Sequence, residues 1–166
     1  MDLNAALIAS QEAVDHMNRL SESAAAAWTT PRAPGKWSPS QVVEHVARSL
    51  EESAKVGRGE PSKFPRLPAV LRPIMRTLFF RRVLKKQGFP KARTNAAMNP
   101  SHGPMTPAEG RIRLETAHGS FHDACRQLAS RGEMFSTTIF GRVPVVEYVR
   151  FMEIHTRHHS KQIGKT

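Results

Sequence analysis

The chain of 166 residues has a single cysteine, Cys125, and no apolar stretch that approaches the roughly 20 residues of a membrane span. One cysteine excludes an internal disulfide and suits a reducing compartment. Its place in an apolar helical pattern predicts a buried, inert thiol. The first residues, Met-Asp-Leu-Asn, have no basic region ahead of an apolar run, as a secretory signal would. We therefore expect a soluble, cytoplasmic protein with one domain, residues 1–166.

Several familiar enzyme signatures are also missing. The chain has no P-loop, no G-x-G-x-x-G fingerprint and no H-E-x-x-H motif, and no motif assigns a serine or cysteine nucleophile. Glu44 and Glu153 lie close to histidines in the sequence, but helical geometry should point their carboxylates elsewhere. The general acid or base is therefore unknown from the sequence.

Acidic residues are scarce in one segment. The formal net charge is +11, and residues 58–93 hold eleven Lys and Arg against one acidic residue, whereas the rest of the chain sums to only +1. Such a segment can serve as a basic arm, a membrane-surface helix or a lid over an anionic substrate. Net charge does not choose among these roles.

Apolar residues recur three or four positions apart in five stretches, which indicates amphipathic helices. The second stretch has a clear start, because Ser38 as N-cap, Pro39 at the first helical position and Gln41 form a capping box. The sequence Thr-Pro-Ala-Glu at 106–109 repeats this signature. The predicted helices cover about residues 3–28, 38–59, 69–86, 106–131 and 144–163, and the second should fade near Gly57 and Gly59.

The middle of the chain is the least regular part. Seven of the twelve prolines lie in residues 60–104, and we expect the short helix there to kink at Pro73. Residues 133–142 should form a connector, and no alternation is long enough to predict a strand. Four long amphipathic helices predict an all-α four-helix bundle, with a basic, proline-rich helical insertion at about 58–104 between the second and third bundle helices.

Three histidines carry the main functional prediction. His155 and His159 stand four residues apart, so on a helix they share one face and can grip one ion. His45, at the edge of the apolar stripe of the second helix, would be interpreted alone as a structural histidine, but it can supply the third imidazole. Sites of three neutral imidazoles accept zinc, nickel, cobalt or iron. We predict a divalent metal site at His45, His155 and His159, with affinity that weakens as pH falls through the imidazole range.

Other residues near this set are given different roles. The helical turn points His158 away from the face that His155 and His159 share. His118 and His122 form another pair four apart and could make a rival site, but we expect them to be polar or partly exposed. Gln162 could orient a ligand or a bound water, yet a glutamine near a helix end is usually solvated. Trp37 more plausibly packs as a hydrophobic staple than as a stacking platform.

The stretch Gly-Lys-Trp-Ser-Pro-Ser-Gln-Val-Val-Glu-His-Val at 35–46, with Phe-Gly-Arg at 140–142 and His-Thr-Arg-His-His-Ser-Lys-Gln-Ile at 155–163, resembles the DinB-like superfamily. This is a family of metalloproteins unrelated to the DNA polymerase of the same name. The resemblance covers essentially the whole chain and implies a four-helix bundle whose histidine triad binds a divalent metal, often zinc or nickel. That triad maps onto His45, His155 and His159.

The resemblance also implies a range of chemistry. Relatives in the superfamily include thiol-dependent enzymes, such as mycothiol-dependent maleylpyruvate isomerase and bacillithiol S-transferases, and many members have no known reaction. A metal with an open position would deprotonate a bound water or thiol near neutral pH. If a low-molecular-weight thiol is the co-substrate, its carboxylates need cationic partners. We hypothesise that Arg72, Arg76, Arg81 and Arg82 supply them as a lid or anion clamp over the mouth of the bundle.

Three function classes therefore follow from the sequence. The first is a metal-dependent enzyme, a thiol-linked transferase or isomerase or a hydrolase, acting on a small and possibly anionic molecule. The second is a non-catalytic metal-binding or stress-related helical module. The third is a membrane-surface or nucleic-acid module that acts through the basic insertion, for which we rate a solvated basic face above either partner. The sequence leaves open whether the chain forms a homodimer.

Overall fold

A computed structural model describes residues 2–90 and 95–164, and over these ranges the chain is mostly helical. Lys91 and Arg93 of the basic segment lie outside the described residues. The expected all-α class is confirmed, apart from one very small sheet. The elements are α1 (Leu3–Ser23), α2 (Pro39–Arg58), α3 (Arg72–Met75), α4 (Arg81–Lys86), α5 (Pro107–Ser130), β1 (Phe135–Thr137), β2 (Gly141–Val143) and α6 (Val145–Ile163).

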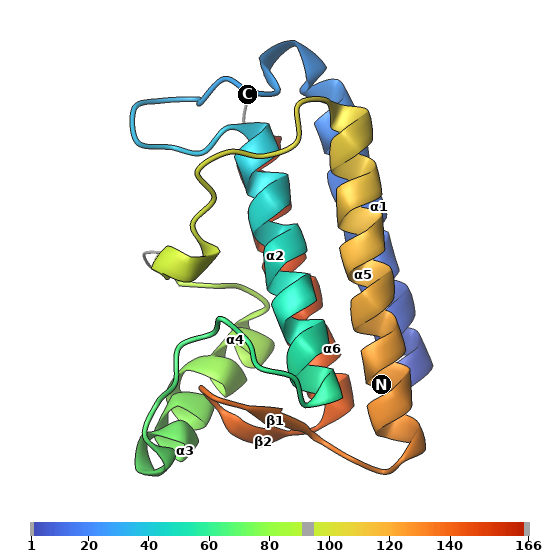
Figure 1. Cartoon of the computed structure of the whole chain (residues 1–166), viewed down its shortest axis with the longest axis vertical. Helices are drawn as coiled ribbons and strands as arrows, with labels where there is room; N and C mark the ends of the chain where they lie inside the picture. Colours follow the sequence, from blue (N-terminus) through green and yellow to red (C-terminus); the bar gives the residue numbers. More distant parts are fainter. Residues whose placement is uncertain (1, 91–94, 165–166) are drawn as a thin grey trace.

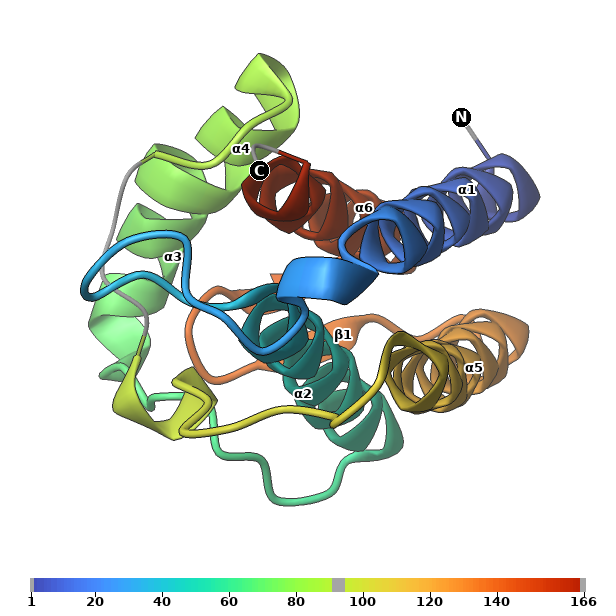
Figure 2. The same ribbon diagram turned by 90° about the horizontal axis from the view of Figure 1, so that it is seen from above.

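Four long helices, α1, α2, α5 and α6, lie side by side (Figures 1 and 2). α2 packs mainly against α5, and α1 packs mainly against α6. The chain runs in one direction along α1 and α6 and in the opposite direction along α2 and α5 (Figure 1). The long connection between α2 and α5 therefore has to return along the molecule, and its helices α3 and α4 lie beside α2 and α6 on the side away from α1 and α5 (Figure 2).

The starts of α2 and α5 follow from their caps. The Ser38 hydroxyl accepts a hydrogen bond from the Gln41 amide at 3.3 Å, and the Gln41 side chain accepts one from the Ser38 amide at 3.0 Å, which confirms the capping box. At α5, Thr106 caps the Glu109 amide, but the Glu109 carboxylate accepts from the Met105 amide instead of the Thr106 amide. Each cap satisfies amide groups that have no partner within the helix.

The end of α1 is earlier than predicted. The α-helix ends at Ser23, and residues 25–27 form a 3₁₀ turn before Trp28, because helix ends often tighten into this geometry. Trp28 is buried at the junction with α5, where its indole N–H donates to the Pro104 carbonyl at 2.8 Å. A Cβ on Gly110 would come within 2.8 Å of the Trp28 ring, so this contact requires glycine.

The core lies between the long helices. α2 ends where it was expected to, near Gly57 and Gly59. Gly57 also allows close approach to α5, because a Cβ there would lie 3.0 Å from the Ala124 Cβ. The helix ends at Gly59, which has the left-handed φ of 75° that glycine adopts without strain. Cys125 is fully buried and burial raises the pKa of its thiol, as predicted for an inert core cysteine.

The connector predicted at 133–142 contains a feature that the sequence pattern did not reveal. β1 and β2 pair antiparallel, with Phe135 opposite Val143. Each strand has three residues, too few to display the alternation that identifies a strand. Phe135 is buried and stacks on Tyr148 of α6 with ring centroids 4.3 Å apart, so the hairpin closes one end of the core.

The helical segment of residues 69–86 is confirmed, but it is not kinked at Pro73. Pro73 lies in the first turn of α3, where a missing amide hydrogen costs no helical hydrogen bond. The irregularity comes later, as a π-helical turn at residues 76–80. Phe80 and Val83 are buried against the rest of the core. Among the described residues, no helix combines the length and the apolar character needed to cross a membrane.

Candidate metal centre

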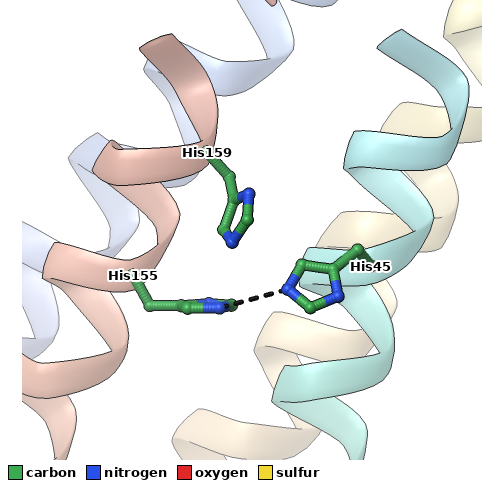
Figure 3. A group of neighbouring side chains, drawn as sticks. All are labelled: His45, His155 and His159. Atoms are coloured by element: carbon green, nitrogen blue, oxygen red, sulfur yellow. Dashed lines mark hydrogen bonds between the residues drawn. The ribbon is translucent and has the colours of Figure 1, made fainter. Parts of the chain in front are cut away.

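The three histidines predicted as ligands converge between α2 and α6 (Figure 3). Their candidate ligand atoms all lie within 4.8 Å of one another. His45 comes from α2, two turns after its capped start, and His155 and His159 come from successive turns of one face of α6. His45 and His159 are buried and His155 is half-buried. The three side chains therefore lie close enough together to bind one metal ion.

The spacing of the facing nitrogens suits shared ligation. The Nε2 atoms of His45 and His155 are 3.2 Å apart. Two imidazole nitrogens that share a tetrahedral ion at the usual distance of about 2.0–2.1 Å stand about 3.3 Å from each other. The ring of His159 lies 4.5 Å from each of the other two rings, centroid to centroid. An ion would therefore require only small rotations of these side chains.

Each imidazole has one nitrogen that does not face the other two histidines, here called the outer nitrogen. Hydrogen bonds at the outer nitrogens of His45 and His159 fix the tautomers of these two rings. The Nδ1 of His45 lies 2.8 Å from the Met98 carbonyl, which can only accept, so Nδ1 carries the proton and Nε2 carries the lone pair. The Nδ1 of His159 donates in the same way to the Gln162 side-chain oxygen at 3.2 Å. This is the usual arrangement around a metal-binding histidine, in which an outer acceptor sets the tautomer and orients the ring.

The third imidazole, His155, has one nitrogen without a hydrogen-bond partner among the described residues. Since Nε2 of His45 carries a lone pair, Nε2 of His155 must donate the hydrogen bond between them. The Nδ1 of His155 is then a buried acceptor, and it has no hydrogen-bond partner in the part of the chain that the structure describes. An ion between the two Nε2 atoms would replace that proton. The proton of His155 would then lie on Nδ1. The three imidazole nitrogens that face one another are the donor set that fits a divalent metal.

All three imidazoles are neutral at physiological pH. Burial lowers the pKa of His45 and lowers that of His155 well below its ordinary value. Burial, and then the neighbouring His45, lower the pKa of His159 to about 3. Only the neutral imidazole has a lone pair for a metal. The protein thus holds these histidines in the form that ligation requires.

Aromatic rings surround the three histidines. Trp37 lies 4.8 Å from the His45 ring and 6.0 Å from the His159 ring, and its indole N–H donates to the Asn99 side chain at 3.1 Å. Phe89, which follows α4, lies 5.3 Å from His155. The prediction for Trp37 missed this position beside the imidazoles. His45 is only eight residues from Trp37, but the contact with His159 spans more than 100 residues and no local pattern signals it.

Carboxylates do not join the set, as predicted. Glu44 pairs with Arg48 at 2.7 Å and with Arg113 at 3.1 Å. Glu153 pairs with Arg157 at 2.5 Å. Both acids adjacent to the histidines are therefore engaged elsewhere.

His158 and Gln162 flank the centre in different ways. His158 is half-buried, with its ring 5.1 Å from that of His159, and it is not part of the convergent group. This agrees with its predicted direction. Gln162 was expected to be solvated, but it accepts the His159 hydrogen bond. Its spacing of three residues from His159 was the available signal.

The second histidine pair differs from its prediction. His118 and His122 are 2% and 8% exposed, not polar surface residues, because their face of α5 packs against α1. The Ser10 hydroxyl lies 3.0 Å from the His118 Nε2. In the described part of the chain, no third histidine, cysteine or carboxylate joins them in a group that could hold a metal.

The arginines proposed as an anion clamp have other contacts. Arg72 donates to the Leu67 carbonyl at 3.0 Å, and Arg76 donates to the Arg142 carbonyl in the hairpin at 2.8 Å. Arg81 and Arg82 are exposed. Within the described part of this segment, it is Phe89 that contacts a triad histidine, through its ring beside His155.

Comparison with known proteins gives one match. No curated protein and no solved structure matches the chain. A family model described as "Protein of unknown function (DUF1569)" matches residues 3–166. Because the match covers nearly the whole sequence, the chain belongs to the DUF1569 family.

Proposed function

We propose that this protein binds one divalent metal ion through His45, His155 and His159, with zinc and nickel as the first candidates. The observation that carries the proposal is the convergence of three neutral imidazoles, two of which, His45 and His159, have the outer hydrogen-bond partners typical of metal ligands. The 3.2 Å separation of the His45 and His155 Nε2 atoms supports it as well, since it is close to the spacing of two ligand nitrogens on one tetrahedral ion.

We propose further that the four long helices form a four-helix bundle of the DinB-like superfamily. Residues 58–104 are then an insertion between the second and third bundle helices. The antiparallel arrangement of α2 and α6, with the triad between them, supports this assignment (Figures 1 and 3). Ligands on facing helices are a common way to build metal sites in bundles.

The activity that we propose is metal-dependent transfer or isomerisation with a low-molecular-weight thiol. When bound, the ion would lower the pKa of a thiol or water in its open position. The neighbouring acids Glu44 and Glu153 are held in ion pairs with arginines, so neither is free to act as a base. The rings of Trp37 and Phe89 lie beside His45 and His155 and add apolar surface next to the histidines.

Metal content tests the site directly. Elemental analysis of untagged protein, purified without added metal, should give about one divalent ion per chain. The variant His155→Ala should lose the ion. His158→Ala is the matched control, because it removes a neighbouring imidazole of the same helix that is not in the triad. Absence of metal from the wild-type protein before and after reconstitution, or equal metal in both variants, would rule out the site.

The thiol requirement has a separate readout. Cobalt(II) in place of the native ion should show a new sulfur-to-metal absorption band when mycothiol or bacillithiol is added. His155→Ala protein treated in the same way should show none. A cobalt spectrum of the wild-type protein that is unchanged by either thiol would leave the metal site standing and exclude a thiol as its ligand.

A further inference from the structure

The helical segment of residues 69–86 is anchored by aromatic packing. Phe80 is fully buried, and its ring lies 4.9 Å from Phe151 and 5.1 Å from Phe140. Phe79 stacks on Phe140 with an interplanar angle of 9°. The hydrogen bond from the Arg76 side chain to the hairpin also holds the segment in place. The segment therefore presents one defined face to the core and one to solvent.

The solvent face carries large apolar side chains. Val70, Ile74 and Leu78 are 78%, 51% and 66% exposed, and Leu71 is exposed beside them. These are four of the seven large apolar residues that are exposed in the described ranges, and they fall within nine consecutive positions. Val70, Ile74 and Leu78 recur at every fourth residue, and all three face solvent. An exposed apolar ridge of this kind marks an interaction surface rather than chance exposure.

Positive charge continues from the same ridge. Arg81, Arg82, Lys85 and Lys86 are exposed and follow Leu78 along the segment. None of the four forms an ion pair in the part of the chain that the structure describes. The sequence has no Asp or Glu from Pro61 to Ala108, so no acid of the same segment compensates them. The charge of this surface therefore suits an anionic partner.

We propose that this ridge, defined as Val70, Leu71, Ile74, Leu78 and the basic residues 81–86, docks on the surface of an anionic lipid bilayer. Apolar side chains beside uncompensated Lys and Arg match the boundary between acyl chains and anionic headgroups. Nucleic acid phosphates would use the basic residues but leave the aliphatic side chains in water. A second copy of the chain would bring two strongly positive faces together. Docking of this kind needs no membrane-spanning helix.

Vesicle co-sedimentation of the full-length protein as purified tests the proposal. The vesicles are phosphatidylcholine alone, or phosphatidylcholine mixed with phosphatidylserine. Binding should require phosphatidylserine and should fall steeply at high salt. The double variant Ile74→Ser/Leu78→Ser should weaken binding about tenfold or more, because two aliphatic side chains that would be buried in the bilayer are lost from the contact. The double variant Arg81→Glu/Arg82→Glu should weaken it at least as much.

Matched controls separate the ridge from general hydrophobicity and charge. Ile8→Ser/Ile112→Ser removes two other exposed isoleucines, and Arg32→Glu/Lys36→Glu makes the same charge change on an exposed loop. Both controls should retain most of the binding. The proposal is overturned if no vesicle binds, if binding ignores phosphatidylserine, or if the controls lose as much as the ridge variants. Dimerisation that Ile74→Ser/Leu78→Ser abolishes, without vesicle binding, would reassign the ridge to a second copy.

Discussion

Two histidine pairs spaced four residues apart lie inside this protein, His155 and His159 on α6 and His118 and His122 on α5. Burial lowers the pKa of all four, to about 3 for His118 and His159 and about 4 for His122. The pairs therefore share spacing, helix geometry and charge state. They differ in what the neighbouring helix presents to them.

Opposite the α6 pair, α2 presents His45, whose Nε2 lone pair is directed to the shared space by the Met98 carbonyl. Opposite the α5 pair, α1 presents the Ser10 hydroxyl, which satisfies one nitrogen of His118 and offers a neutral oxygen that binds metals poorly. Nε2 of His122 has no partner among the described residues. A pair of buried histidines becomes a candidate metal centre only when a third basic ligand and outer acceptors complete it.

The largest expected effect comes from removing the third ligand. His45→Ala should reduce metal affinity by more than the roughly 100-fold that loss of an outer hydrogen-bond partner costs. His118→Ala, which deletes an imidazole from the other pair, should leave affinity unchanged. Competition with a chromophoric chelator measures both. Equal loss in the two variants would show that the α5 pair contributes to metal binding.

The α5 pair should contribute to the loss of stability at low pH. The pKa of His122 is about 4 in the folded protein and near 6.5 when exposed, so the unfolded chain binds more protons between these values. Stability is therefore complete above about pH 6.5 and is lost as pH falls toward 4. In metal-free protein, His122→Leu should reduce this loss by about 1–3 kcal/mol. At neutral pH it should cost little, because it removes an unsatisfied group.

Urea unfolding of the metal-free wild-type and His122→Leu proteins across this pH range measures the difference. The α6 histidines titrate alike in both proteins, so they cancel in the comparison. Parallel stability curves for the two proteins would mean that His122 is accessible to protons in the folded state.

The convergence of the three histidines was predictable because its signals are local or repeated along helices. The capping box of Ser38 and Gln41 gives the start of α2, and the spacing of His155 and His159 gives their common face. The packing of α2 against α6 then brings His45 to them. The outer partners were not predictable in the same way. The Met98 carbonyl is a backbone group 53 residues from His45, and no residue pattern identifies it.

In the fold, too, features with a local pattern were predictable and features that depend on distant contacts were not. Long amphipathic helices repeat their apolar spacing many times, so their number and class were clear from the sequence. The hairpin has three residues in each strand, and its Phe135 is explained only by the Tyr148 ring that it covers. The burial of His118 and His122 was missed because their polarity outweighed their position beside the core residues Phe121 and Cys125. Tertiary contacts, which the local sequence pattern does not show, determine both the hairpin and the burial of these two histidines.

A smaller effect on metal affinity is expected from removing the hydrogen-bond acceptor of the His159 Nδ1. Gln162→Leu keeps the side-chain volume and removes the acceptor of the Nδ1 hydrogen bond. Metal affinity should fall about 10- to 100-fold, with the fold retained. Gln127→Leu on the exposed face of α5 is the matched control. Unchanged affinity in Gln162→Leu would mean that packing alone orients the His159 ring.

The smallest effect would come from giving the α5 pair the ligand that it lacks. Ser10→Cys is nearly isosteric and replaces a hydroxyl 3.0 Å from the His118 Nε2 with a thiol that becomes an anionic ligand on metal binding. In a His45→Ala/His155→Ala background, Ser10→Cys protein should bind cobalt(II) weakly, with an absorption band from thiolate to metal. The same background with Ser10 should show no band. Binding by both proteins would mean that two buried imidazoles suffice, whereas binding by neither would mean that the outer acceptors seen at the α6 pair are as necessary as the third ligand.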